Sequence, residues 1–387
     1  MRVAAKMNRL GTETAFEMLA RARALEAKGK HVVHLEIGEP DFDTPANIVE
    51  AGVAALKQGW THYGPSAGLP ELREAIARES SQVRGVTHTA DQVVVTPGAK
   101  PIMFFVILSL VDEGDEVIYP NPGFPIYESM INFVGGVPVP VQLREDRAFR
   151  FDVGELRQKV SDKTRLIILN SPQNPTGGVL TRSDLEEVAD IASERNIPVL
   201  TDEVYRRIIY SGEHFSIASL PGMQDKAIIL DGFSKTYAMT GWRLGYGIMP
   251  LDLAAHITRL MTNSASCTAS FIQRAGVEAI TGPQEEPARY VAEFKRRRDV
   301  IVDGLNQIRG FSCLRPQGAF YVFPNVSRVG MPSSALADYL LTEAGVATLS
   351  GGSFGQYGEG YLRLSYANSV ENLQIALERI KAAVARL

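Results

Sequence analysis

Two cysteines are all that this 387-residue chain contains, too few for a disulfide framework or a four-thiolate metal site. It has no excess of basic charge either: 40 lysines and arginines face 44 aspartates and glutamates, and the net charge of −4 argues against a nucleic-acid surface. The longest apolar run, Ile102–Val111, has about half the length that crosses a bilayer. Charged residues interrupt Met1–Leu19, so it does not resemble a signal peptide. These absences predict a cytoplasmic protein that binds neither nucleic acid nor membrane.

What the chain does contain is ordinary for a globular enzyme or binding protein. Apolar residues make up 45% and charged residues 22% of the sequence. Because 387 residues exceed one small core, a large domain with a smaller one is the natural expectation.

Short apolar segments recur along the chain, and between them lie patterns typical of helices. The strand candidates are Val93–Thr96, Glu116–Tyr119, Val137–Val141, Arg165–Leu169, Pro198–Thr201, Ala227–Leu230 and Leu244–Met249. Several are continuously apolar, which is typical of strands buried on both faces. The helix candidates include Leu69–Glu79 and Arg182–Glu194, the second with Ser183 as its expected N-cap and Glu186 three residues later. The alternation predicts an α/β fold with a mostly parallel, seven-stranded sheet covered by helices.

The pattern changes in the last third of the chain. A long charged helix is expected over Ala288–Leu305, followed by shorter strands and a closing helix over Val370–Leu387. We therefore expect a large domain at 44–285 and a smaller α+β domain that combines an N-terminal part, 1–43, with a C-terminal part, 286–387.

Polar residues follow four of the expected strands, where ligands bind in open α/β sheets. Pro97–Pro101 would present backbone N–H groups to an anion at a helix start. Asn170–Gly177 contains two X-Pro bonds, each of which can adopt the cis form. They predict a rigid loop that fixes Asn174. Asp202 and Tyr205 follow the next strand. The four strand ends together predict one polar site.

Lys235 follows the fourth of these strands, and Arg243 stands eight residues further on. An amine forms an imine only when it is neutral, which a desolvating pocket favours. Arginine stays charged and suits phosphate oxygens. Most lysines just past a strand are ordinary surface residues, so only the joint placement of the four strand ends favours a Schiff-base site for a phosphate-bearing cofactor.

Six ordered motifs carry a resemblance that covers nearly the whole chain: Gly38–Phe42, Tyr63–Arg73, Asn170–Gly177, Asp202–Tyr205, Ser234–Arg243 and Arg363–Tyr366. The chain resembles the class I/II aminotransferases, pyridoxal-phosphate enzymes with the aspartate aminotransferase fold (fold type I). It is most similar to the bacterial and archaeal subgroup with Ala-Met-Thr-Gly-Trp-Arg after the lysine. The resemblance implies an enzyme that moves an amino group from an L-amino acid to a 2-oxo acid, such as 2-oxoglutarate, by a ping-pong mechanism.

The resemblance also implies roles around the cofactor, pyridoxal 5'-phosphate. Lys235 would hold it covalently and then carry a proton as general base and acid. Asp202 would pair with its ring nitrogen, while Tyr205 and Asn174 would contact its O3′. Phe124 would stack on the ring.

The phosphate would lie between Arg243 and the backbone amides of Ala99 and Lys100. Tyr63 would reach it from a neighbouring subunit, which implies a homodimer with shared active sites. Many relatives place a serine three residues before the lysine, but Gly232 stands there in this chain. Whether Ser234 contacts the phosphate instead is therefore left open.

For the substrate, the resemblance implies that Arg363 holds the α-carboxylate, helped by Asn174 and the backbone N–H of Gly38. Some relatives use a lysine at the position of Lys100 to meet the distal carboxylate of aspartate or glutamate. This favours acidic donors, with aromatic or other donors possible, although Lys100 could merely border the phosphate.

Other readings of the motifs are weaker. Gly351–Gly355 matches a hydrolase nucleophile elbow, but every histidine precedes Ser353 and the order required by that fold fails. His31, His34 and Glu36 hint at metal spacing without further ligands, so no metal is expected. The serious rival is a carbon–sulfur β-lyase on the same fold, which would use the same Lys235. A regulator fused to a DNA-binding domain is disfavoured, because the segment before Gly38 is too short for a winged helix.

Overall fold

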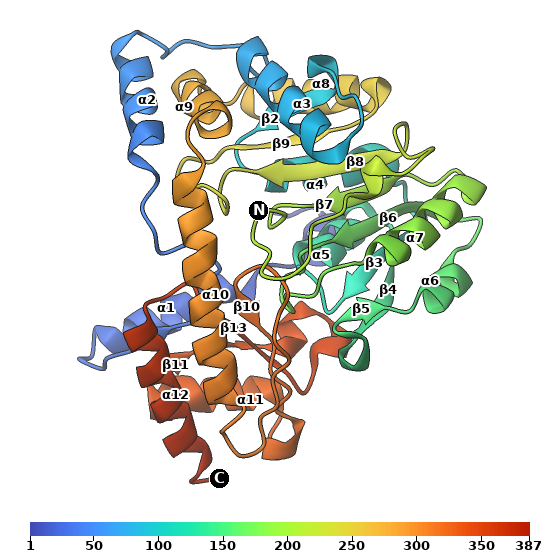
Figure 1. Ribbon diagram of the computed structural model, residues 1–387. Helices are drawn as coiled ribbons and strands as arrows, with labels where there is room; N and C mark the ends of the chain where they lie inside the picture. Colours follow the sequence, from blue (N-terminus) through green and yellow to red (C-terminus); the bar gives the residue numbers. More distant parts are fainter.

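A computed structural model describes residues 1–387. Its largest sheet has eight strands, β2 (Val93–Thr96), β3 (Glu116–Asn121), β4 (Val137–Arg144), β5 (Arg150–Phe151), β6 (Thr164–Asn170), β7 (Val199–Asp202), β8 (Ala227–Gly232) and β9 (Gly245–Ile248). Their order in the sheet is β2-β9-β8-β7-β6-β3-β4-β5 (Figure 1). The four neighbouring pairs from β8 to β4 are parallel, whereas β9 runs antiparallel to both of its neighbours and β5 to β4.

The expected mostly parallel sheet is confirmed, and each of the seven expected strands forms. The count of seven was wrong by one strand. The eighth, β5, has only two residues and pairs at the edge of the sheet, so it is too short to show an apolar pattern of its own.

The continuous apolar runs are explained by burial on both faces of this sheet. In β2, Val93 and Val95 belong to one apolar core and Val94 to the other. In β6, Ile167 belongs to the core of Val93 and Val95, and Ile168 belongs to the core of Val94. Successive side chains of a strand point to opposite faces, so a strand covered on both sides must be apolar at every position.

Helices supply the two covers (Figure 1). Residues of α4 (Lys100–Leu110), α5 (Ile126–Val134) and α8 (Leu251–Ala265) complete one core. Residues of α2 (Ala46–Lys57), α3 (Pro70–Arg84), α6 (Val153–Lys159), α7 (Arg182–Arg195) and α9 (Ser270–Thr281) contribute to the other. None of the helices combines the length and the apolar character that a membrane span requires.

Local sequence explains where these helices begin and end. The α3 helix has Pro70 in its first turn and ends at Gly85, whose φ of 67° is left-handed. The expected N-cap of α7 was wrong: the helix is capped by Thr181, whose hydroxyl accepts from the N–H of Asp184 at 3.2 Å, and not by Ser183. Thr181 has an extended backbone with ψ of 163°, as an N-cap requires, whereas Ser183 already lies inside the helix.

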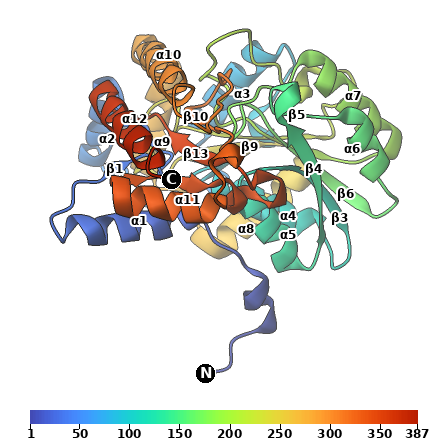
Figure 2. The same ribbon diagram turned by 90° about the horizontal axis from the view of Figure 1, so that it is seen from below.

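The two ends of the chain meet in a separate group of elements (Figure 2). A parallel pair joins β1 (Val33–His34) to β11 (Val346–Ala347), and a three-stranded sheet has the order β10 (Tyr321–Val322), β13 (Leu362–Ser365), β12 (Leu349–Ser350). Around them lie α1 (Thr14–Glu26), α10 (Glu285–Leu305), α11 (Ser333–Tyr339) and α12 (Val370–Val384). The helices expected over 288–305 and 370–387 thus form, while the domain limits at 43 and 285 remain predictions.

Candidate active site

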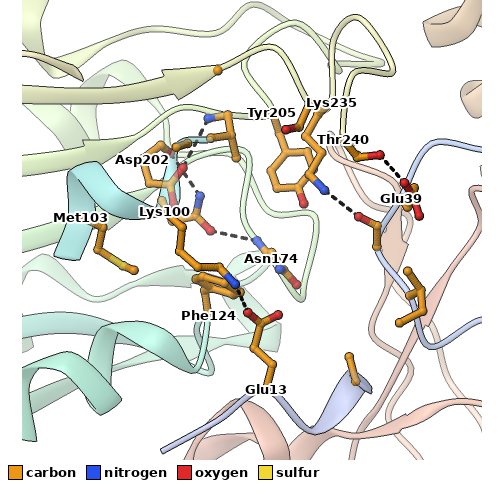
Figure 3. A pocket seen from close by; sticks show the side chains of 18 of the residues that line it. Glu13, Glu39, Lys100, Met103, Phe124, Asn174, Asp202, Tyr205, Lys235 and Thr240 are labelled. Carbon is orange, nitrogen blue, oxygen red and sulfur yellow. Dashed lines mark hydrogen bonds and ion pairs between the residues drawn. The ribbon is translucent and has the colours of Figure 1, made fainter. Parts of the chain in front are cut away.

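A cavity of about 530 Å³ opens where β6, β7 and β8 end, between the large sheet and the terminal segments (Figure 3). Eleven of the twelve residues expected at the site line it: Gly38, Ala99, Lys100, Phe124, Asn174, Asp202, Tyr205, Ser234, Lys235, Arg243 and Arg363. The twelfth, Tyr63, does not; it is 90% exposed. Residues from five of the six motifs, together with Ala99, Lys100 and Phe124, therefore share one cavity.

Asp202, the last residue of β7, is 7% exposed and has no cationic partner. Its Oδ2 accepts from the hydroxyl of Tyr127 at 2.5 Å, and its Oδ1 accepts from the N–H of Val204 at 3.3 Å. Burial raises the pKa of Asp202 to about 6, although the Tyr127 hydrogen bond opposes this. The carboxylate can therefore accept a cationic N–H donor. Tyr127 was missed by the sequence reasoning, because a tyrosine in an amphipathic helix looks like core.

Asn170 connects the ends of two strands behind this carboxylate. Its Nδ2 donates to the backbone oxygen of Asp202 at 3.1 Å, and its Oδ1 accepts from the N–H of Asn174 at 3.0 Å. The peptide bonds before Pro172 and Pro175 are cis, the option that the sequence had left open. Asn174 and Asp202 are thus held by one shared side chain.

Lys235 is partly buried and donates from Nζ to the backbone oxygen of Gly38 at 2.6 Å. Burial lowers the pKa of Lys235 to about 8; Glu39 acts against this, and Arg363 adds to it. Near neutral pH a much larger fraction of this amine is uncharged than of an exposed lysine. This property suits an amine that must react with an aldehyde.

A pair of phenols stands beside Lys235. The hydroxyls of Tyr205 and Tyr321 are 2.7 Å apart, and both residues are buried. Burial raises the pKa of Tyr205 well above its usual range, so it remains a neutral hydrogen-bond donor. A Cβ on Gly38 would lie 1.9 Å from the Tyr321 hydroxyl, so only glycine allows the backbone to approach this closely. Sequence reasoning had identified Tyr205 but not Tyr321.

Close backbone approach also shapes the part of the cavity near Arg243. A Cβ on Gly98 would lie 2.2 Å from the Arg243 Nη2, and one on Gly245 would lie 2.3 Å from the backbone nitrogen of Ala99. Arg243 itself has a left-handed φ of 56°, and its Nη1 donates to the backbone oxygen of Thr240 at 2.8 Å. The first turn of α4 lies beside this guanidinium, and such a helix start favours an anion.

Arg363, on β13, is 4% exposed and has no carboxylate partner. Its Nη1 donates to Asn174 Oδ1 at 3.2 Å and its Nη2 to the backbone oxygen of Glu36, while its Nε has no partner. The guanidinium carbon lies 4.6 Å from the ring centre of Tyr321. Burial lowers the pKa of Arg363. Because a guanidinium stays charged and this one has no carboxylate partner, it can receive an anionic ligand.

Lys100, the first residue of α4, also lines the cavity. Its Nζ forms an ion pair with Glu13 and lies 5.4 Å from the ring centre of Phe124 (Figure 3). Glu13 precedes α1 and was missed by the sequence reasoning. No local pattern connects a glutamate near the start of the chain to a lysine 87 residues away.

A family model described as aminotransferase class I and II matches residues 30–380. The aspartate aminotransferase of Pyrococcus abyssi is 42% identical over 356 residues, which is 91% of each chain. The aromatic-amino-acid aminotransferase 2 of Thermococcus litoralis is 40% identical and covers 90% of this chain and 91% of its own. A solved structure of Thermus thermophilus aspartate aminotransferase with maleate has a TM-score of 0.94 at 36% identity and covers 99% of this chain and 100% of its own.

Proposed function

The chain belongs to the class I and II aminotransferases, a family that uses pyridoxal phosphate, and on that premise we propose that it prefers aspartate or glutamate as amino donor. The amino group passes to a 2-oxo acid such as 2-oxoglutarate by a ping-pong mechanism. The observation that carries the amino-transfer reaction is the buried, cation-free Asp202 in one cavity with Lys235. No relative named above is a carbon–sulfur lyase, so nothing favours that alternative.

The residues fit the cofactor. Asp202 matches a protonated ring nitrogen, Phe124 offers an aromatic face, and the close approach of Gly98 to Arg243 forms a compact place for a phosphate. When bound, pyridoxal phosphate supplies an electron sink for the electron pair left at the substrate α-carbon. We assign Ala99 and Lys100 backbone amides to the phosphate; for Ser234 this role stays a prediction.

In this proposal Lys235 moves the proton. Its neutral amine takes the proton from the substrate α-carbon and later returns one, as general base and then acid. The lowered pKa of Lys235 keeps enough of the neutral form available, and the Gly38 carbonyl orients the amine. Tyr205 remains a phenol and donates toward the cofactor's O3′, with Asn174 beside it.

Arg363 orients the donor. Its unpartnered Nε and its neighbouring N–H groups would hold the α-carboxylate, with Asn174 and the Gly38 N–H as further contacts. A charge-assisted hydrogen bond of this kind contributes about 1.5–3 kcal/mol. Fixing the carboxylate also fixes the direction of the Cα–H bond toward Lys235.

Lys100 supports the acidic preference, because it places a cation in the cavity apart from Arg363. The name of the Pyrococcus relative agrees with this preference, and that of the Thermococcus relative leaves aromatic donors as a second class. Lys100→Ala should reduce kcat/KM for aspartate about three- to tenfold more than for phenylalanine or alanine, since only aspartate has a second carboxylate. Equal losses for all donors would remove the acidic-substrate argument.

The decisive test is a single turnover of the purified, cofactor-loaded protein with one amino acid and no acceptor. We expect stoichiometric release of the matching 2-oxo acid and its reversal by 2-oxoglutarate. The Lys235→Ala protein should release none. Pyruvate with ammonia from cysteine or cystathionine, and no oxo acid from aspartate, would instead identify a lyase.

A homodimer is part of the proposal. Tyr63 is 90% exposed, and Val49, Val53 and Leu56 of α2 are also exposed, an arrangement that a second copy would cover. We propose that Tyr63 reaches the phosphate of the neighbouring subunit. Light scattering and mixed dimers of Tyr63→Phe with Lys235→Ala subunits would test this. The cytoplasmic location stays a prediction.

A further inference from the structure

The ion pair between Glu13 and Lys100 lines the cavity (Figure 3). The Glu13 side chain is 19% exposed and that of Lys100 is 46% exposed. The two residues come from the starts of different helices, α1 and α4. Their contact therefore joins the N-terminal segment to the start of α4.

Neither side chain caps its own helix. Glu13 occupies the N-cap position of α1, yet its side chain makes no capping hydrogen bond. Lys100 is the first residue of α4, where a cation is unfavourable against the helix dipole. Helix capping therefore does not explain the pair, and both side chains line the cavity.

Charges in the cavity nearly balance. Four lining residues are basic, Lys100, Lys235, Arg243 and Arg363, and three are acidic, Glu13, Glu39 and Asp202. Lys235, Asp202, Arg243 and Arg363 have roles toward the cofactor and the substrate backbone, and Glu39 accepts from the Thr240 hydroxyl. Glu13 and Lys100 are therefore the charged lining residues that could contact the substrate side chain.

We propose that Glu13 determines donor specificity. Its carboxylate pairs with Lys100 and so blocks the position where the distal carboxylate of an acidic substrate would bind. This inference rests on the proposed aminotransferase function. An acidic donor must displace Glu13 from Lys100, whereas an uncharged donor binds with the internal pair intact. Phe16, 61% exposed and also lining the cavity, offers apolar contact to such an uncharged side chain. Glu13 thus lowers the preference for acidic donors and lets one site accept both classes.

The test compares Glu13→Gln with a matched control, Glu17→Gln, on the exposed side of the same helix. In the cofactor-loaded enzyme, Glu13→Gln is expected to raise kcat/KM for aspartate about two- to fivefold relative to phenylalanine, the size expected for losing one partly exposed competing ion pair. The Kd of maleate, a dicarboxylate probe, should fall by a similar factor by calorimetry, which requires no turnover. Glu17→Gln should change neither quantity, and Glu13→Asp, which keeps the charge, should stay near wild type.

A double-mutant cycle assigns the effect to Lys100. In the Lys100→Ala background, Glu13→Gln should no longer change the ratio of aspartate to phenylalanine. The proposal is overturned if Glu13→Gln alters both donors equally, if its effect persists without Lys100, or if Glu13→Asp gives the same gain. A wild type that transfers nitrogen from no donor would instead refute the proposed function, and the maleate measurement would still report on the pair.

Discussion

Replacing Asp202 by asparagine should stabilise the cofactor-free protein at neutral pH while it impairs the reaction. Burial raises the pKa of Asp202 to about 6, against about 3.9 in an unfolded chain. The native state therefore binds this proton more tightly than the unfolded state does. The contribution of this carboxyl to stability is complete below about pH 4 and is lost as the pH rises through about 6.

The magnitude follows from the two pKa values. Linkage gives a cost of about 3 kcal/mol at pH 8 for the ionised, buried carboxylate, and only about 0.5 kcal/mol at pH 4. Asparagine has nearly the same shape, carries no charge and can still accept from the Tyr127 hydroxyl. Asp202→Asn should therefore raise the free energy of unfolding by up to about 3 kcal/mol at pH 8 and change it little at pH 4.

The neighbouring carboxylate provides a control of opposite sign. Glu203 is fully buried. Burial alone would raise its pKa, but Arg84, whose Nη2 lies 2.6 Å from Oε2, lowers that pKa overall. Glu203→Gln leaves the Arg84 charge buried without its partner and should cost about 3–5 kcal/mol at pH 8.

Urea unfolding of the cofactor-free proteins at pH 4 and pH 8, at one protein concentration, measures both effects. The reasoning is refuted if Asp202→Asn destabilises the protein at pH 8, or if its gain is the same at both pH values. Saturating cofactor should reverse the order, because wild type alone can pair a carboxylate with the ring nitrogen.

Three further outcomes are expected. The rate at which the cofactor-free protein captures pyridoxal phosphate should have its pH midpoint near pH 8, the pKa of Lys235, and should fall about tenfold per pH unit below it. Glu39→Gln should move this midpoint to lower pH. A midpoint above pH 10 would show that Lys235 is not desolvated. Arg363→Gln should lower kcat/KM for amino acid donors in single turnovers about 10- to 150-fold. An amine without an α-carboxylate should react equally with the wild type and with this variant. A matching loss for that amine would mean that Arg363 is structural. Gly245→Ala places a Cβ 2.3 Å from the Ala99 backbone nitrogen, whereas a Cβ at Gly241 meets nothing within 4 Å. Gly245→Ala should therefore weaken cofactor binding, measured by titration, more than Gly241→Ala does. Equal affinities would contradict the assignment of the phosphate to this part of the cavity.

Much of the fold could be predicted from local sequence. The apolar segment at 93–96 and the helix over 182–194 have patterns set by burial and by turn residues, which act over a few neighbouring positions. The strand β5 and the N-cap Thr181 were not predicted. A two-residue strand has no period, and the choice between Thr181 and Ser183 depends on where the chain leaves its extended conformation.

The sequence by itself determined which chemical groups stand after the strands: the amine of Lys235, the carboxylate of Asp202 and the guanidinium of Arg363. Tertiary structure alone decided their properties and their further partners. Tyr127 meets Asp202, Tyr321 meets Tyr205, and Glu13 meets Lys100 across long separations in the chain. A sequence pattern reports contacts between near neighbours, whereas the pKa of a group depends on all atoms that replace water around it, and these come from distant segments only when the chain is folded.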